Sequence, residues 1–436
     1  MTSVLRRFRF TEFQLLVAPS LMTVVGLLTI FLARTGSTRW SWSDIWVSIA
    51  YVALIFLMTI WLSATGFKGD QVLFPVVATI AGIGLLEIER LNPVLAARGA
   101  GWTNVAQRQV IYLAIGLLLL WAMMVFVKRL DWLRRYKYSW GFFGLGLMAV
   151  TMVFGENVNG ARLWLNLGVA TVQPSELVKV LLVVFLAAYL DDYGDLIAGS
   201  YRVGPFRLPP IPYLLPMVFM WAAALAIVVL QNDLGTALLF FGIFLVMLYV
   251  ATGRLLYVGI GLSSFAVGVY VAYQLFARIA VRVQNWINPW ADPLNKGFQQ
   301  IQAEYSMAAG HIFGTGLGYG HPQYIPAVET DYIFAALAEE LGLLGTIAII
   351  ALYVVLVARG SLIALRAERG FPQLLAVGLT TILALQTLII LAGTLRVLPL
   401  TGITLPFISA GGSSLLTNFI IVGLLLRISE NRSIKT

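Results

Sequence analysis

The sequence contains no cysteine and only two histidines among its 436 residues. The lack of cysteine excludes disulfide bridges, thiolate metal sites and cysteine nucleophiles, and two histidines are too few for a histidine-rich metal site. Charged residues are also scarce, at 11%, whereas soluble domains carry about 25%. Hydrophobic residues make up 60% of the chain. This composition excludes ordinary water-soluble globular proteins and indicates a polytopic membrane protein.

About twelve apolar stretches are long enough, or nearly so, to cross a bilayer as helices. A helix satisfies its own backbone hydrogen bonds, which lipid cannot do. The predicted fold class is therefore all-α, a polytopic membrane helix bundle with about 12 transmembrane helices and a long extracytoplasmic loop at 277–332. The stretches are 13–33, 45–64, 71–88, 109–127, 139–154, 175–190, 212–230, 234–252, 255–276, 333–358, 373–395 and 405–426.

The distribution of Lys and Arg predicts the orientation of the chain. If the N-terminus is cytoplasmic, most basic residues of the loops lie inside, which fits twelve crossings with both termini in the cytoplasm. The net charge of +9 is then explained by topology and by anionic lipid, and nucleic acid is not an expected partner. Two unusually polar segments, 155–174 and 277–332, lie on the predicted outer side. Within the second, 299–309 has the amphipathic character of a helix on the membrane surface.

Ionisable residues at membrane depth are functional candidates. Glu176 and Lys179 are three residues apart in the stretch 175–190, so they share one helix face. They could form an internal ion pair between helices or take part in substrate binding. Asp233 lies in a short turn between two stretches, where it could act on substrate or simply cap the next helix.

A second group of carboxylates surrounds the start of the stretch 333–358. Glu329 and Asp331 lie at its mouth, and Glu339 and Glu340 lie about two turns deeper. Asp331 or Thr330 could be an ordinary helix cap. The two deeper glutamates need polar partners, and contacts between helices are the expected role for them.

Three further features of the predicted outer side suggest an anion-binding surface. Arg162 and Arg282 lie outside, against the general trend of the basic residues. The segment 398–415 contains Gly-Gly-Ser-Ser, including Ser413, at the mouth of the last stretch. Its small residues could cradle a phosphate through backbone N–H groups or could simply allow helices to pack closely.

Six sequence motifs in order resemble the SEDS family (shape, elongation, division and sporulation), which includes RodA and FtsW. They are GARLWLNLG (160–168), QPSELVK (173–179), DLGTA (233–237), GHIFGTGLG (310–318), TDYIFAALAEELGLLG (330–345) and LPLTGITLPFISAGGSSL (398–415). The resemblance covers roughly 70–427, and the run QVLFPVVATIAGIGLLEIERLNP favours the RodA branch. The chain is thus expected to be a single integral membrane domain, 1–436, with an extra N-terminal helix pair at 1–68 before a SEDS-like core at 69–436.

The resemblance implies a bacterial peptidoglycan glycosyltransferase of the cytoplasmic membrane. Such enzymes polymerise lipid II, a disaccharide-pentapeptide carried on undecaprenyl diphosphate, into glycan strands at the outer face. The expected partners are a class B penicillin-binding protein, which crosslinks the glycan, together with lipid II, undecaprenyl-linked glycan and the membrane itself.

The resemblance also implies a catalytic role for Asp331, whose motif Thr330-Asp331-Tyr332-Ile333-Phe334 matches the TDFIF motif of the family. The chain departs from the family at Glu329, where His is usual, at Ala327, where Glu is usual, and at Asn232 and Ala410, where Pro and Tyr are usual. The candidate substrate-binding residues are Arg162, Glu176, Lys179, Arg282, Gln299, Thr330 and Ser413.

The chemistry of the implied reaction fits a single carboxylate. An inverting glycosyl transfer needs a general base on the attacking hydroxyl, and a diphosphate leaves as a stable anion without a strong acid. Cationic groups would stabilise the charge on the leaving group, and Arg162, Lys179, Arg282 and Arg396 are available for this on the predicted outer side. A divalent cation, Mg²⁺ or Mn²⁺, could assist the diphosphate, although the sequence has no metal-binding motif.

Two other functions fit parts of the sequence. Intramembrane carboxylates and helices interrupted by Gly and Pro also occur in transporters, so a flippase for a lipid-linked precursor is an alternative. However, the polar motifs gather on one predicted face, and no inverted repeat is visible. The third interpretation is a scaffold that only recruits a partner synthase.

Overall fold

The computed structural model of the chain describes residues 9–35, 42–99, 104–127, 129–158, 161–168, 171–199, 201–203, 206–208 and 211–430. The chain divides into two compact units. Unit 1 comprises Met1–Phe126, Val281–Arg359 and Gln386–Thr436. Unit 2 comprises Val127–Ala280 and Gly360–Leu385, so α12, α14 and α15 contribute residues to both units.

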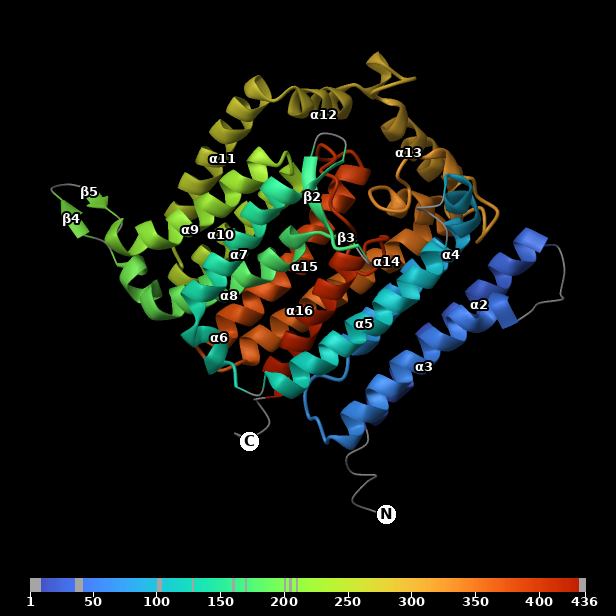
Figure 1. Cartoon of the computed structure of the whole chain (residues 1–436), viewed down its shortest axis with the longest axis horizontal. Coiled ribbons are helices and arrows are strands. Elements are labelled where there is room, and N and C mark those ends of the chain that lie inside the picture. Colours follow the sequence, from blue (N-terminus) through green and yellow to red (C-terminus); the bar gives the residue numbers. More distant parts are fainter. Residues whose placement is uncertain are drawn as a thin grey trace. The chain divides into compact units, whose positions relative to one another are not determined.

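Long helices and short connecting elements make up unit 1, and α2 and α3 lie side by side within it (Figure 1). The elements that lie in it or enter it are α2 (Phe10–Thr35), α3 (Trp42–Ala64), α4 (Leu73–Ala97), α5 (Val105–Phe126), α12 (Ala277–Ile287), the 3₁₀ helix η2 (Pro289–Ala291), α13 (Phe298–Ala309), the 3₁₀ helix η3 (Pro322–Tyr324), α14 (Ile333–Arg366), α15 (Phe371–Thr394) and α16 (Gly412–Glu430).

Unit 2 is helical with two small antiparallel sheets, one of order β1-β2-β3 and the other a β4-β5 hairpin. In the first sheet, Asn157 of β1 faces Arg162 of β2. The elements are α6 (Asp131–Arg135), α7 (Lys137–Phe154), β1 (Glu156–Val158), β2 (Ala161–Asn166), β3 (Thr171–Val172), α8 (Pro174–Ala198), β4 (Tyr201–Val203), β5 (Phe206–Leu208), α9 (Ile211–Leu230), α10 (Leu234–Thr252) and α11 (Leu255–Leu275).

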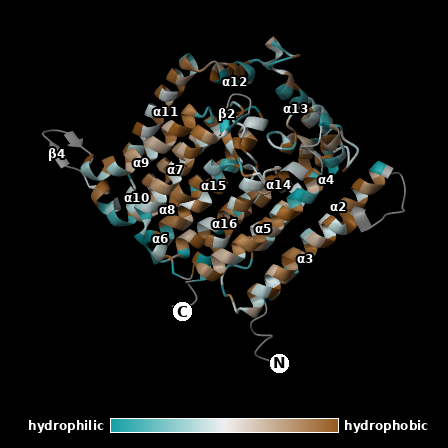
Figure 2. Ribbon diagram, viewed as in Figure 1, coloured by the Kyte–Doolittle hydropathy of each residue, from teal (hydrophilic) through white to brown (hydrophobic). Residues whose placement is uncertain are grey.

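The prediction of a polytopic all-α bundle is confirmed. Each predicted stretch corresponds to a helix, and nine helices in the described residues are long and apolar enough to cross a membrane. Figure 2 shows hydrophobic residues along most of α5 and α11. The helices α4, α7 and α8 are not among the nine, and α4 and α8 carry several charged side chains within their length. The count of about twelve crossings stays a prediction.

Two predicted boundaries need correction. The last stretch was expected from residue 405, but α16 begins at Gly412, because 405–411 is a turn in which Phe407 has a φ of 66°. The segment 277–332 was expected to be mainly a loop, but it contains α12 and α13. The helix expected at 299–309 is confirmed as α13, and its position on the membrane surface stays a prediction.

Small residues allow the helices of each unit to approach closely, as is usual where lipid gives no hydrophobic drive for association. In unit 1, α16 packs along α5, and a Cβ atom on Gly116 would lie 2.3 Å from the ring of Phe419. In unit 2, α7 packs on α8 and α9, and a Cβ atom on Gly141 would lie 2.5 Å from Met220. A larger residue at Gly116 would clash with the ring of Phe419, whereas at Gly141 the end of the Met220 side chain would have to move.

Candidate active site

A tight turn places Asp331 directly before α14. The carbonyl of Ala327 accepts hydrogen bonds from the amides of Thr330 (3.2 Å) and Asp331 (3.1 Å). Ala327 itself has a φ of 52°, a left-handed conformation that is uncommon for a residue with a side chain. From Tyr332 to Glu340 every residue is buried, so the start of α14 is firmly held. Asp331 remains partly exposed at the edge of this buried segment.

Arg282 of α12 and the loop around Gly402 meet Asp331 from two sides. The Arg282 Nη1 atom donates to the carbonyl of Thr401 at 3.1 Å. A Cβ atom on Gly402 would lie 3.6 Å from both Arg282 Nη2 and Asp331 Oδ2. Gly402 has a φ of 78°, which favours glycine. The guanidinium of Arg282 and the carboxylate of Asp331 therefore both lie close to Gly402, and the backbone conformation at 402 is what favours glycine there.

Removal from water raises the pKa of Asp331 to about 6. The hydrogen bond from Thr330 and the positive charge of Arg282 lower this pKa, whereas the charge of Glu329 raises it by a smaller amount. A carboxylate with this pKa is mostly ionised at neutral pH and is a stronger base than an ordinary aspartate.

Glu329 has a partner of its own. Its side chain is 3% exposed, and its Oε2 atom lies 3.2 Å from Nη1 of Arg98, the residue that ends α4. Its carbonyl accepts a hydrogen bond from the amide of Ala410 at 2.8 Å. The hydroxyl of Ser409 donates to the carbonyl of Thr330 at 2.7 Å. Two of the positions that depart from the family, 329 and 410, are therefore in direct contact, and the segment 398–415 holds the turn that carries Asp331.

The helix α13 contributes two glutamines beside this turn. Gln299, a predicted substrate residue, donates from Nε2 to the carbonyl of Pro326 at 2.8 Å. Gln300 was not singled out from the sequence, yet its Oε1 atom accepts from the hydroxyl of Tyr332 at 2.8 Å. Only the contact with Tyr332 identifies Gln300, since an isolated glutamine carries no signal in the sequence. Ser413 lies in the first turn of α16 and is partly exposed.

The remaining predicted substrate residues lie in unit 2. Arg162 is exposed on β2. Lys179 is buried in α8, and its Nζ atom lies 2.5 Å from Oε2 of Glu176. The ion pair that the sequence allowed is therefore present. The substrate role of these three residues stays a prediction.

Several carboxylates have structural roles. Asp233 caps α10, as it accepts from the amide of Thr236 at 3.1 Å and from its hydroxyl at 2.7 Å. Glu340 accepts from Nε of Arg90 at 2.7 Å, and Glu339 accepts from the amide of His321 at 2.5 Å. The cap and the polar contacts expected for these residues are confirmed. In the described residues, by contrast, no hydrogen bond joins the Asp331 carboxylate to an amide of α14, so a capping role for it is not supported.

A break in α14 was not predicted. Gly342 has a φ of 67° and a ψ of −169°, so the helix is interrupted there. The segment 310–318 satisfies the freed groups: the amides of Thr315 and Gly316 donate to the carbonyls of Glu339 (2.9 Å) and Glu340 (3.0 Å). In return, the amide of Leu343 donates to the carbonyl of His311 at 3.0 Å. The glycine-rich motif of the loop is thus explained by this close backbone contact.

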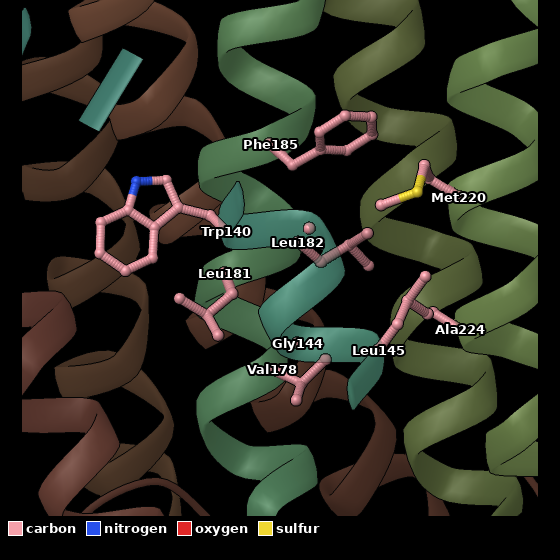
Figure 3. Close-up of a pocket in the computed structure, with 10 residues that line it drawn as sticks. Trp140, Gly144, Leu145, Val178, Leu181, Leu182, Phe185, Met220 and Ala224 are labelled. Atoms are coloured by element: carbon pink, nitrogen blue, oxygen red, sulfur yellow. The ribbon is translucent and has the colours of Figure 1, made fainter. Parts of the chain in front are cut away.

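Other possible sites offer less chemistry. The cavity in Figure 3 lies in unit 2 and is lined by side chains of α7, α8 and α9, with Trp140, Phe185 and Met220 at its walls. None of its lining residues is charged, so it offers no acid or base. Among the described residues, no group of three or more acidic or histidine side chains is arranged to hold a metal ion.

Comparison with known proteins identifies the family of this chain. The model of the FtsW/RodA/SpoVE family of cell cycle proteins matches residues 70–434. The chain belongs to this family. Several members of the FtsW/RodA/SpoVE family are similar over most of its length. Peptidoglycan glycosyltransferase RodA of Mycobacterium tuberculosis (strain ATCC 25618 / H37Rv) is 37% identical over 427 residues, which cover 97% of this chain and 90% of that protein.

Further relatives agree with this placement. RodA of Mycobacterium leprae (strain TN) is 40% identical over 83% of this chain and 78% of its own length. Stage V sporulation protein E of Bacillus subtilis (strain 168) is 37% identical over 74% of this chain and 87% of its own length. The expected membership in the SEDS family, and within it the RodA branch, is confirmed.

Solved structures of the family share the fold. A chain from a structure titled "Structural coordination of polymerization and crosslinking by a peptidoglycan synthase complex" matches with a TM-score of 0.68 and 30% identity, over 84% of this chain and 98% of that chain. RodA of Thermus thermophilus matches with a TM-score of 0.61 and 27% identity over the same shares. The FtsW/RodA/SpoVE model begins at residue 70, and the assignment of 1–68 as an addition to a common core stays a prediction.

Proposed function

We propose that this chain is a peptidoglycan glycosyltransferase that polymerises lipid II with Asp331 as its general base. The observation that carries the assignment is the position of Asp331: a partly exposed carboxylate with a pKa raised to about 6, near Gly402 and the guanidinium of Arg282. The class of reaction follows from family membership and from relatives named peptidoglycan glycosyltransferase.

In the proposed step, Asp331 takes the proton from the sugar 4-hydroxyl of the acceptor. The hydroxyl oxygen bonds to the anomeric carbon of the donor, and the bond between that carbon and the diphosphate oxygen breaks. The electron pair leaves with undecaprenyl diphosphate, and the anomeric centre inverts from alpha to beta. The proton stays on Asp331 until solvent removes it, so one carboxylate serves the whole step.

Arg282 would serve the same step from the other side. Its guanidinium favours the ionised form of Asp331 in the free enzyme, and a planar guanidinium also suits phosphate oxygens. Thr401 holds the side chain by its carbonyl, which fixes the direction in which the remaining N–H groups point. Arg396 is a further cation for the diphosphate, and Gln299, Thr330 and Ser413 are further polar contacts for the sugars. A role of Arg162, Glu176 and Lys179 in substrate binding stays a prediction.

We further propose that the reaction takes place at the outer face of the bacterial cytoplasmic membrane, with both termini in the cytoplasm. A class B penicillin-binding protein is the expected partner, since the matching solved chain belongs to a complex whose title couples polymerization with crosslinking. Asp331 lies close before α14, a helix long and apolar enough to cross a membrane, where a lipid-held substrate would present its headgroup. The distribution of Lys and Arg along the sequence supports the outer side.

The alternative of a transporter has one supporting feature, the broken helix α14. In transporters, the backbone groups freed by such a break bind the ion or substrate. In this chain the carbonyls of Glu339 and Glu340 are already taken by Thr315 and Gly316. The break therefore serves the packing of a loop, and glycosyl transfer is the function that the site supports best.

The test is polymerisation of lipid II by the purified full-length protein, with and without a cognate transpeptidase. Asp331→Asn keeps the size of the side chain but removes the base, so we expect polymer formation to fall by at least about 10²-fold, the usual contribution of a general base. Partner binding and thermal unfolding in detergent should remain as in the parent. If Asp331→Asn polymerises lipid II at the parental rate, the assignment of the base is wrong.

A further inference from the structure

The ion pair between Arg98 and Glu329 lies within two residues of the proposed base. The Oε2 atom of Glu329 lies 3.2 Å from Nη1 of Arg98, and the glutamate side chain is 3% exposed. The Nη2 atom of Arg98 also donates to the carbonyl of Gln323 at 3.5 Å. Arg98 therefore joins the end of α4 to the turn that carries Asp331.

The local charges explain why this pair matters. The charged and titratable groups recorded around Asp331 are Arg282 from α12 and, from its own segment, Glu329 and Tyr332. Glu329 acts against ionisation of Asp331, whereas Arg282 favours it. A buried carboxylate without a partner would act more strongly, because little solvent screens it.

We propose that Arg98 is a positioning residue for glycosyl transfer: by pairing with the buried carboxylate of Glu329, it limits how strongly that carboxylate opposes the ionisation of Asp331. The proposal rests on the proposed function, since it concerns the same base. It also explains how a chain with glutamate at 329 can keep an active aspartate at 331: the additional negative charge comes with a cation of its own.

The test is the pH dependence of kcat/KM for lipid II polymerisation. In Arg98→Gln, Glu329 has lost its cationic partner and should raise the pKa of Asp331. The acidic limb of the kcat/KM profile should then move to higher pH by roughly half to one unit. In Glu329→Gln the remaining Arg98 charge should move the same limb to lower pH. The double variant should return to the parental limb, and Arg98→Lys should stay close to it.

A matched control is available in the same unit. Arg34 is 31% exposed and lies 3.5 Å from Glu89, whereas Arg98 is 32% exposed. Arg34→Gln removes a comparable ion pair that does not include the turn of Asp331, so it should leave the pH profile unchanged. Thermal unfolding of each variant in detergent shows whether the protein remains folded.

The outcomes separate three roles of Arg98. Limb shifts of opposite sign in the two single variants, cancelled in the double variant, support the proposal. A uniform loss of kcat/KM at every pH would mean that Arg98 is only structural, and a higher KM without a limb shift would mean that it binds the donor; either result overturns the proposal. If Asp331→Asn keeps the parental activity and pH profile, the assignment of Asp331 as the base is wrong. If Asp331→Asn is inactive but the Arg98 and Glu329 variants keep the parental pH profile, only the role proposed for Arg98 is wrong.

Discussion

Replacing Gly342 by alanine should separate the two parts of α14 from the loop that holds them. The backbone at Gly342, with φ 67° and ψ −169°, is a conformation open essentially to glycine alone. A Cβ atom there would lie 2.2 Å from the amide nitrogen of Gly314 and 2.6 Å from the carbonyl oxygen of Ile312. Both neighbours are backbone atoms, so neither can turn aside as a side chain could.

The magnitude follows from these two penalties. The disfavoured backbone conformation costs about 1–3 kcal/mol, and overpacking in a well-packed interior costs about 1–3 kcal/mol more. We therefore expect Gly342→Ala to destabilise the protein by about 2–6 kcal/mol. Because the loop 310–318 donates hydrogen bonds to the carbonyls of Glu339 and Glu340, in the helix that follows Asp331, polymerisation of lipid II should fall together with stability.

The assay is thermal unfolding in detergent, with Gly268→Ala as the matched control. Gly268 lies in α11, and a Cβ atom there would meet nothing within 4 Å. The control should be neutral or stabilise the helix by up to about 1 kcal/mol. If Gly342→Ala unfolds at the same temperature as the control and keeps full activity, the backbone contact between 310–318 and α14 does not hold this region in place.

Two further predictions concern charged groups. The acidic limb of kcat/KM should lie near pH 6, because Asp331 has a pKa raised to about 6 and acts only when it is deprotonated; activity should therefore fall as the pH drops through this value. The measurement is a pH titration of initial rates. An acidic limb near pH 4 would contradict the assignment of a base with a raised pKa. Glu176→Gln should destabilise the protein by roughly 1.5–3 kcal/mol, the usual contribution of a hydrogen bond to a charged group, because the buried Lys179 loses the carboxylate that lies 2.5 Å from its Nζ atom. Denaturation of this variant beside Lys179→Met, which should be milder, tests that reasoning.

The helical fold could be predicted because lipid leaves so few choices to the backbone. Long apolar stretches have to form helices in a bilayer, and each predicted stretch does correspond to one. The break at Gly342 could not be predicted, since glycine is common in membrane helices. What causes the break is its contact with 310–318, a segment that precedes it by more than twenty residues, and no local pattern reveals such a contact.

The candidate site, too, could be predicted from the sequence only in part. Asp331 could be singled out because ionisable residues near apolar stretches are functional candidates and because its motif resembles that of the family. Arg282 could be singled out because it lies on the predicted outer side, against the trend of the basic residues. The roles of Gly402 and Arg98 depend on segments far apart in the sequence, so only the folded chain identifies them. Arg98 illustrates this well: the sequence showed that Glu329 replaces the usual histidine, but not which residue compensates the new charge.

The interruption at Gly342 leaves a short rod, 333–341, between the loop 310–318 and the proposed base. At 1.5 Å per residue its length is roughly 13 Å. The backbone hydrogen bonds from 310–318 end on the last turn of this rod, and Asp331 lies two residues before its beginning. The loop 310–318 and Asp331 therefore lie at opposite ends of one short helix, so a substitution that moves the loop acts on the aspartate through the rod and not through the sugar-binding residues.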